Sequence, residues 1–514
     1  MSIWKPPLYS AIWVSASLTS AMLLVFAWHL YPVPDGDSIF FLPAIKAYAS
    51  TGVVDNKLVD LSFITDPDGL GRFLFYTSGF PVIMGSAMAL FGASSYQLAL
   101  LFLSLVRAAS TFLLAKSLVV ILRKYSLQGN AFYVLPASAI VISSGLFLFA
   151  SNGRPEILSM FIVSASILAA ISINTTPGKH IFLVFCIALL FPVSIANGII
   201  ACSFYLLYLF VDVKSLKIRA ALVLIAVALG LLFIVLSYLA AGLPLSDGLK
   251  GLSIHSKLAV GRSDSGLELT LSYWKSWIAF AILAIVCLVM TLLSRQLIRP
   301  SSLAIFDRLW LGSSILILCS CVYFFGFRAA PIHYNLYAFL PLYQLLCFRL
   351  LVNLGSRNSK VLSYGLQGIL VAGLSLSLLD PLRSVVLFPY YLASGSTYSQ
   401  AINNFLALDI GECALMHTSG LAVLDESQSG SQFQVDNSSH AIISNRLKFL
   451  DRDPACIAAI VQEVNSNSRV PVNMEEIADY SDSSSWTPRL RALRLLNSPK
   501  GYSFNAYRQD ILVK

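Results

Sequence analysis

The hydrophobic residues of the chain fall into long continuous blocks that short polar segments separate. A helix needs about 20 residues to cross about 30 Å of membrane hydrocarbon, because each residue adds about 1.5 Å. About eleven blocks approach this length, so we expect an all-α polytopic membrane protein. The predicted spans are residues 11–31, 97–122, 131–150, 156–174, 180–196, 198–211, 220–242, 276–294, 308–327, 333–351 and 361–380. No small-residue cleavage site follows the first block, so we expect it to be retained.

Between the first two predicted spans, residues 32–96 are expected to form one long outer loop with two juxtamembrane helices. The segment from Phe80 to Gly92 is strongly apolar, but its length of about thirteen residues is typical of an interfacial or re-entrant piece. Ile39 to Ala49 is predicted to form a second surface helix, which Thr51-Gly52 ends.

A helix break is predicted within residues 180–211, because Pro192 and Asn197-Gly198 interrupt this apolar stretch. Such breaks are tolerated where they face protein or a watery cavity. Two shortened helices that meet near the outer face therefore fit the pattern better than one helix.

The pattern changes after Asp380. Residues 381–514 are much more polar, and apolar stretches such as 413–424 and 455–464 are separated by polar turns. This alternation predicts a small soluble C-terminal domain of the α/β type, which follows a transmembrane module at residues 1–380.

The composition agrees with a membrane protein. Of the 514 residues, 57% are hydrophobic and only 12% are charged, and the mean hydropathy is +0.75. A soluble globular chain is nearer half apolar and a quarter charged. The net charge of +9 does not indicate nucleic-acid binding, because the basic residues lie mostly in short loops between apolar blocks. There they set the topology and can contact anionic membrane lipid.

The basic residues also orient the predicted spans. If the N-terminus is cytoplasmic, the only acidic residues of the inner segments are Asp212 and Asp307, and basic residues far outnumber them. This excess is what the positive-inside rule requires. The basic residues are Lys5, Arg123, Lys124, Lys179, Lys214, Lys217, Arg219, Arg295, Arg299, Arg308, Arg349, Arg357 and Lys360. We therefore expect a plasma-membrane protein, in bacteria an inner-membrane protein, whose residues 381–514 are extracytoplasmic.

Two cysteines, Cys413 and Cys456, lie outside the predicted spans. The compartment that the topology gives them is oxidising in most cells, so we predict a disulfide between them. Two separately buried thiols are the alternative.

Candidate chemistry begins directly after the first span, in Pro34-Asp35-Gly36-Asp37-Ser38. Carboxylates this close together at a membrane surface can accept a proton or bind a divalent cation. Solvated aspartates that cap the next helix are the alternative. Arg72 adds a cation later in the same loop.

Later outer connections contribute further charges. Arg154 and Glu156 lie together in one very short connection, where a local ion pair at the membrane edge is the alternative. Arg328 and His333 lie before and at the start of the tenth predicted span, where interface anchoring is the alternative. Another outer loop, residues 243–275, holds Lys250, His255, Lys257 and Arg262. Arg107 lies within a span and is expected to be structural, because an ion in hydrocarbon requires a partner in the bundle.

A set of motif residues runs from the first loop to the tenth predicted span. Asp37 is followed by an aromatic residue, Phe41, four positions later and by Gly52 fifteen positions later. The remaining features are Phe80-Pro81 and Phe91-Gly92 at the ends of the short apolar helix, Arg107, the Gly-Arg-Pro-Glu run at 153–156, and His333-Tyr334 before Pro341.

This arrangement resembles the GT-C superfamily of polytopic glycosyltransferases, which includes protein mannosyltransferases, the lipid A aminoarabinose transferase and the oligosaccharyltransferase catalytic subunit. The likeness covers roughly residues 1–380. Two positions depart from the family pattern: Ser38 follows Asp37 where many members have Glu, and His333 stands where Arg is common.

The resemblance implies an enzyme that moves a hexosyl or pentosyl group from a polyprenyl-phosphate donor to a glycan, lipid or protein acceptor on the extracytoplasmic face, usually with inversion. Asp37 would be the catalytic base, and Asp35 would support it or bind Mg²⁺ or Mn²⁺ with it. Glu156, held by Arg154, would position the acceptor. The implied substrate-binding residues are Arg154, Arg328, His333, Tyr334, Arg72, Lys250, His255 and Arg262.

Two other functions remain open. The predicted break near Pro192 would suit a transporter or flippase of lipid-linked sugars, which builds its site from discontinuous helices. However, the chain has no repeated halves, and its acidic residues cluster at the outer surface. A surface-polysaccharide ligase or polymerase is the third function, but such proteins usually carry a basic outer loop late in the bundle.

Overall fold

The computed structural model describes residues 9–31, 38–55, 76–92, 96–124, 131–147, 154–173, 176–249 and 253, parts of 338–348 and 385–393, and five strands between 413 and 509. Of the eleven predicted spans, the first seven fall on described residues and coincide with helices. These are α1 (Ser10–Trp28), α4 (Tyr96–Lys124), α5 (Ala131–Phe147), α6 (Glu156–Ser172), α7 (Thr176–Val193), α8 (Ile195–Asp212) and α9 (Leu216–Ala240). The other four predicted spans lie wholly or largely outside the described residues.

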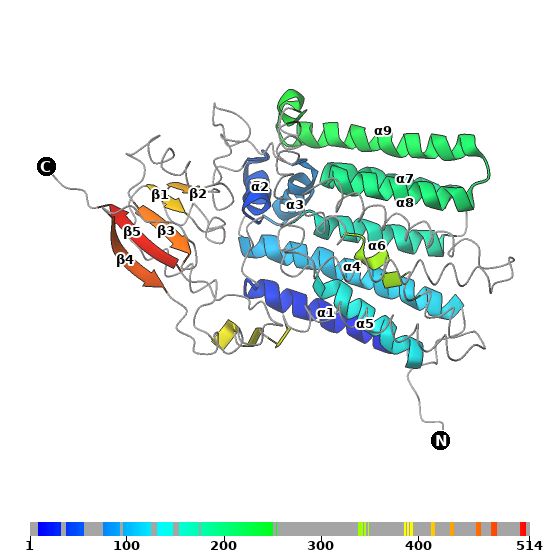
Figure 1. Cartoon of the computed structure of the whole chain (residues 1–514), viewed down its shortest axis with the longest axis horizontal. Helices are drawn as coiled ribbons and strands as arrows, with labels where there is room; N and C mark the ends of the chain where they lie inside the picture. The colour runs from blue at the N-terminus through cyan, green and yellow to red at the C-terminus, as the bar shows by residue number, and fades with distance from the viewer. Residues whose placement is uncertain are drawn as a thin grey trace, which may run out of the picture.

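Three helices of the described part are long and apolar enough to cross a membrane: α1, residues Gln97–Arg123 of α4, and α9. The described parts of α5, α6, α7 and α8 also contain apolar helices, which are slightly shorter. These helices run side by side in one bundle, with α1 against α4 and α5, and α7 against α9 (Figure 1). The chain is therefore a multi-pass membrane protein.

Small residues let the helices approach closely, as in other membrane bundles. A Cβ on Gly145 of α5 would overlap Thr19 of α1, so only glycine fits there. The hydroxyls of Ser110 in α4 and Ser164 in α6 lie 2.9 Å apart and share a hydrogen bond. Arg107 is buried within α4, where the sequence predicted a structural cation.

Both juxtamembrane helices of the first loop are present as α2 (Ser38–Thr51) and α3 (Gly79–Leu90). They pack on each other, and a Cβ on Gly85 of α3 would lie 2.8 Å from the carbonyl oxygen of Ile45. Helix α2 stops at Gly52, whose φ of +73° is a left-handed conformation that glycine adopts without strain.

The predicted break in residues 180–211 is present at Ser194, between Pro192 and Asn197-Gly198, which is a few residues before the boundary of the two predicted spans. The Ser194 hydroxyl accepts a hydrogen bond from the backbone N–H of Asn197, so it caps α8 and lets the helix begin sooner. Gly198 instead lies inside α8, close to the ring of Phe191. Helices α7 and α8 have 18 residues each, so they are two nearly full-length helices joined by a tight turn.

Successive helices alternate in direction, so the bundle has two distinct ends (Figure 1). We name one the α2–α3 end: it holds α2, α3, the ends of α1, α5, α7 and α9, and the beginnings of α4, α6 and α8. We name the other the basic end. There Arg123 lies over the Tyr9 ring at 5.2 Å, and Arg219 donates to the carbonyl oxygen of Val213.

A five-stranded mixed sheet forms within residues 381–514. Its strands are β1 (Cys413–Met416), β2 (Gln432–Val435), β3 (Ala459–Glu463), β4 (Met474–Tyr480) and β5 (Phe504–Gln509), in the order β2-β1-β3-β5-β4. β1 is parallel to β2 and β3, whereas β5 is antiparallel to β3 and β4. Most other residues of 381–514, Cys456 among them, lie outside the described part of the chain, so the separate α/β-type domain and the disulfide stay predictions.

Candidate functional site

A buried ion pair lies at the α2–α3 end of the bundle. Nε of Arg154 donates to Oε2 of Glu156 at 3.0 Å, and a second guanidinium nitrogen donates to Oε1 at 3.3 Å. The two side chains are only 8% and 5% exposed. Two parallel hydrogen bonds fix the carboxylate in orientation as well as in position. The short connection that the sequence singled out therefore forms a fixed, buried group.

Local backbone geometry explains why the two charges meet. Pro155 stands between them with a φ of −65°, and Glu156 is the first residue of α6. The carbonyl oxygen of Arg154 accepts a hydrogen bond from the N–H of Ile157, so the turn is closed directly before the helix. A carboxylate in the first turn is also stabilised by the helix dipole.

A second polar link continues from this pair into the bundle. Ser159 follows Glu156 by three residues, so both lie on one face of α6. The Asn197 side chain at the beginning of α8 donates from Nδ2 to Oγ of Ser159 at 2.9 Å. Oδ1 of Asn197 is buried and accepts no hydrogen bond from the described residues. From the sequence, Asn197 was interpreted only as a helix breaker. An Asn within an apolar block could have indicated this bond, because a buried amide needs a hydrogen-bond partner.

The start of α3 closes the same end of the bundle. A Cβ on Gly79 would overlap the carbonyl group of Pro192, the penultimate residue of α7. Next to it, the Ser78 hydroxyl donates to the Ser237 hydroxyl in α9 at 3.2 Å. These contacts were not predicted, because residues that are far apart in sequence make them.

Aromatic side chains join α2 to this assembly. The Phe41 ring lies 4.7 Å from the Tyr76 ring and 5.7 Å from the Phe80 ring, measured between ring centroids. Phe41 and Phe80 are fully buried. The aromatic position that follows Asp37 by four residues thus packs α2 onto α3. Asp37 immediately precedes α2, so the chain leads from this carboxylate directly into the packed pair of helices.

Of the predicted site residues, the structure brings Arg154 and Glu156 together. The others lie outside the described residues and stay predictions: Asp35, Asp37, Arg72, Lys250, His255, Arg262, Arg328, His333 and Tyr334. Within the described part of the chain, no three His, Cys, Asp or Glu side chains are grouped to hold a metal ion. The predicted ligands Asp35 and Asp37 are not among the residues to which this finding applies.

No protein-family model matches the sequence, and no curated protein matches it. Among solved structures, the archaeal oligosaccharyltransferase AglB from Archaeoglobus fulgidus, in complex with an inhibitory peptide and a dolichol-phosphate, is similar with a TM-score of 0.50 and 11% identity. The match covers 89% of this chain and 69% of AglB.

Two other solved structures are similar at lower TM-scores. ArnT from Cupriavidus metallidurans, bound to undecaprenyl phosphate, has a TM-score of 0.48 and 14% identity over 96% of this chain and 98% of ArnT. The arabinofuranosyltransferase AftD from Mycobacteria has a TM-score of 0.40 and 11% identity, over 96% of this chain and 40% of AftD. From the likeness to AglB, we conclude that the chain has a GT-C-type fold, as its sequence motifs indicated.

Proposed function

We propose that this protein is a membrane glycosyltransferase that moves a sugar from a polyprenyl-phosphate donor to an acceptor on the extracytoplasmic face. The observation that carries the proposal is the buried Arg154–Glu156 pair, which lies at the α2–α3 end of a GT-C-type bundle. The AglB structure with a similar fold contains a dolichol-phosphate, which is a lipid phosphate of the proposed donor class.

In the proposed reaction, an acceptor hydroxyl or amide attacks the glycosyl carbon while the bond from that carbon to the lipid phosphate breaks. Asp37 takes the acceptor proton, and the phosphate leaves on its polyprenyl chain. Attack from the side opposite the leaving group inverts the glycosyl carbon. A carboxylate base and cations at the departing phosphate are what this chemistry requires.

Glu156 has a positioning role in this proposal. Its carboxylate already accepts two hydrogen bonds from Arg154, which hold it in one position and orientation. A paired carboxylate of this kind suits acceptor placement better than proton transfer. Because Arg154 is engaged by Glu156, we assign the donor phosphate to Arg328, His333 and Tyr334, with further contacts proposed for Arg72, Lys250, His255 and Arg262.

The proposal keeps Asp35 and Asp37 as ligands for Mg²⁺ or Mn²⁺. Carboxylate oxygens are the ligands that these hard cations prefer. A bound cation would supply positive charge near the departing phosphate.

The transporter or flippase alternative loses its main support. It depended on a helix broken within the membrane, whereas α7 and α8 are two antiparallel helices of 18 residues that turn at Ser194. Each is about 27 Å long at 1.5 Å per residue, which is close to the thickness of the hydrocarbon core. The turn is therefore at the α2–α3 end of the bundle and not at its middle.

We also propose the predicted orientation, with a cytoplasmic N-terminus, an extracytoplasmic domain at residues 381–514 and residence in the plasma membrane, in bacteria the inner membrane. Arg123, Lys179, Lys214 and Lys217 lie at the basic end of the bundle, opposite α2 and α3. Positive residues mark the cytoplasmic side of membrane proteins.

Transfer can be tested in proteoliposomes that contain the purified protein and a panel of undecaprenyl-phosphate hexoses and pentoses. Release of undecaprenyl phosphate reports sugar transfer to an acceptor extract. We expect Asp37→Asn to abolish release and Glu156→Gln to reduce it. Asp212→Asn is the matched control, because Asp212 ends α8 at the basic end. Wild-type release by Asp37→Asn would refute the assigned base, and no release from any donor by the wild type would refute the transferase.

A further inference from the structure

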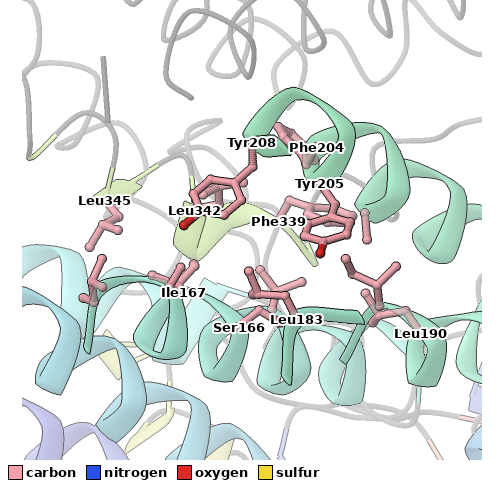
Figure 2. A pocket seen from close by; sticks show the side chains of 15 residues that line it. Ser166, Ile167, Leu183, Leu190, Phe204, Tyr205, Tyr208, Phe339, Leu342 and Leu345 are labelled. Carbon is pink, nitrogen blue, oxygen red and sulfur yellow. The ribbon is translucent and has the colours of Figure 1, made fainter. Parts of the chain in front are cut away.

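An apolar groove lies between α6, α7, α8 and the side chains of Phe339, Leu342 and Leu345, away from the Arg154–Glu156 pair. Figure 2 shows side chains from three sides converging on it, with Ile167 from α6, Leu183 from α7, and Tyr205 and Tyr208 from α8. Apart from Ser166 and the two tyrosines, every lining residue is apolar. Such a lining suits a hydrocarbon chain.

On α6 the groove lies in the half of the bundle next to the basic end, whereas on α7 it continues past the middle of the helix to Leu190. Its lining on α6 runs from Val163 to Ile171, which is one residue before that helix ends. Eight residues of α-helix extend about 12 Å. One leaflet contributes about 15 Å of hydrocarbon, so the α6 side of the groove has about the depth of one leaflet.

A basic cluster, formed by Lys179 and His180, stands at the end of the groove next to the basic end of the bundle. Nζ of Lys179 lies 5.4 Å from the centre of the Tyr208 ring, and Nδ1 of His180 lies 3.1 Å from the Tyr205 hydroxyl. Lys179 is 9% exposed and His180 is 5% exposed. Both tyrosines also line the groove, so the basic cluster contacts two side chains of its lining.

We propose that this groove is a binding site for an anionic phospholipid of the leaflet at the basic end. One acyl chain lies between α6, α7 and α8, and the phosphate lies at Lys179 and His180. An ammonium over the Tyr208 ring and an imidazole beside the Tyr205 hydroxyl offer a phosphate both charge and hydrogen-bond donors. Zwitterionic lipids carry a compensating positive charge and lack this complementarity.

This site is distinct from the proposed donor site. A donor that reacts at the α2–α3 end has its phosphate there, whereas the cations beside the groove are at the opposite end of α7. The phosphate of a membrane lipid lies at one surface of the membrane, so a given lipid places its phosphate at only one end of the helix bundle. The basic cluster therefore binds a lipid of the leaflet at the basic end, and the proposed donor belongs to the leaflet at the α2–α3 end.

Native mass spectrometry of the purified full chain, titrated with phosphatidylglycerol or with phosphatidylcholine, tests the proposal. We expect the wild type to retain phosphatidylglycerol preferentially, and Lys179→Ala to lower its affinity about fivefold, since one basic residue near a lipid surface contributes about 1 kcal/mol. Lys179→Arg should restore most of the affinity. Ala170→Phe, which fills the lined space, should remove binding while Lys179 remains in place.

Lys217→Ala is the matched control, because Lys217 is exposed in the first turn of α9 at the same end. It should leave the affinity unchanged. Equal retention of both lipids, or equal affinity in Lys179→Ala and the wild type, would overturn the proposal. Displacement of phosphatidylglycerol by one equivalent of undecaprenyl phosphate would also overturn it and assign the groove to the donor tail. Because binding is measured without transfer, the result is independent of the proposed enzyme activity.

Discussion

Asn197 at the start of α8 donates a 2.9 Å hydrogen bond to Ser159, which lies one turn beyond Glu156 on α6. This bond joins two helices whose contact residues are 38 positions apart in the sequence. It connects the turn between α7 and α8 to the helix that carries the buried Arg154–Glu156 pair. The position of the candidate site therefore depends on the α7–α8 turn.

Asn197→Ala should reduce stability and weaken transfer, because it removes this bond. Hydrogen bonds between membrane helices contribute about 0.6 kcal/mol on average and up to about 1.7 kcal/mol. A double-mutant cycle with Ser159→Ala, measured by thermal unfolding in detergent, should give a coupling energy in this range. Strictly additive effects of the two substitutions would contradict a direct interaction.

Breaking the Arg154–Glu156 pair from one side should cost more than removing it altogether. Arg154→Met leaves a buried carboxylate without its bidentate partner, a change that typically costs about 3–5 kcal/mol. The double variant Arg154→Met/Glu156→Gln should recover a large part of this lost stability, while its transfer stays below that of the wild type. Thermal unfolding and transfer, measured on the same preparations, separate the two effects. A double variant that is less stable than either single variant would disprove this account.

Gly79→Ala should destabilise the α2–α3 end, because the added Cβ would overlap the carbonyl group of Pro192. Overpacking of this kind typically costs about 1–3 kcal/mol. Ser86→Ala, on the exposed side of the same helix, is the control and should be nearly neutral. Limited proteolysis of the first loop would measure local opening. Equal cleavage rates for both variants would mean that α3 is not packed tightly against α7.

Removal of divalent cations should lower transfer if Asp35 and Asp37 bind one. We expect a chelator to reduce undecaprenyl phosphate release and added Mg²⁺ or Mn²⁺ to restore it. Asp35→Asn should raise the cation concentration needed, whereas Asp37→Asn should remain inactive at every concentration. Full transfer in the presence of the chelator would remove the metal from the proposal and leave the base in place.

The proposed orientation predicts opposite labelling of two engineered cysteines. Ser126→Cys follows α4 at the basic end, and Gly430→Cys lies in the C-terminal region. In intact cells, an impermeant thiol reagent should label position 430, whereas position 126 should need permeabilisation. Labelling of both positions on one side would show that the number of spans between them differs from the prediction.

Local pattern was enough to place the first helices of the bundle. Apolar blocks of membrane length marked α1, α4 and α9, and short apolar runs beside turn signals marked α2 and α3, because helix formation in a membrane depends on residues close in sequence. The Arg154–Glu156 pair was also visible, since only Pro155 separates its members. The break between α7 and α8 was predicted from Pro192 and Asn197-Gly198, but not its exact position at Ser194, because the pattern alone does not show which hydroxyl caps α8.

Only the tertiary structure decided what these helices place side by side. The Asn197–Ser159 bond, the contact of Gly79 with Pro192, and the groove beside Lys179 all join residues from different helices. Such contacts depend on how the helices rotate and pack, and many packings bury apolar faces equally well. The sequence therefore determined that the chain crosses the membrane and where charge is available, whereas packing determined which charges are buried together.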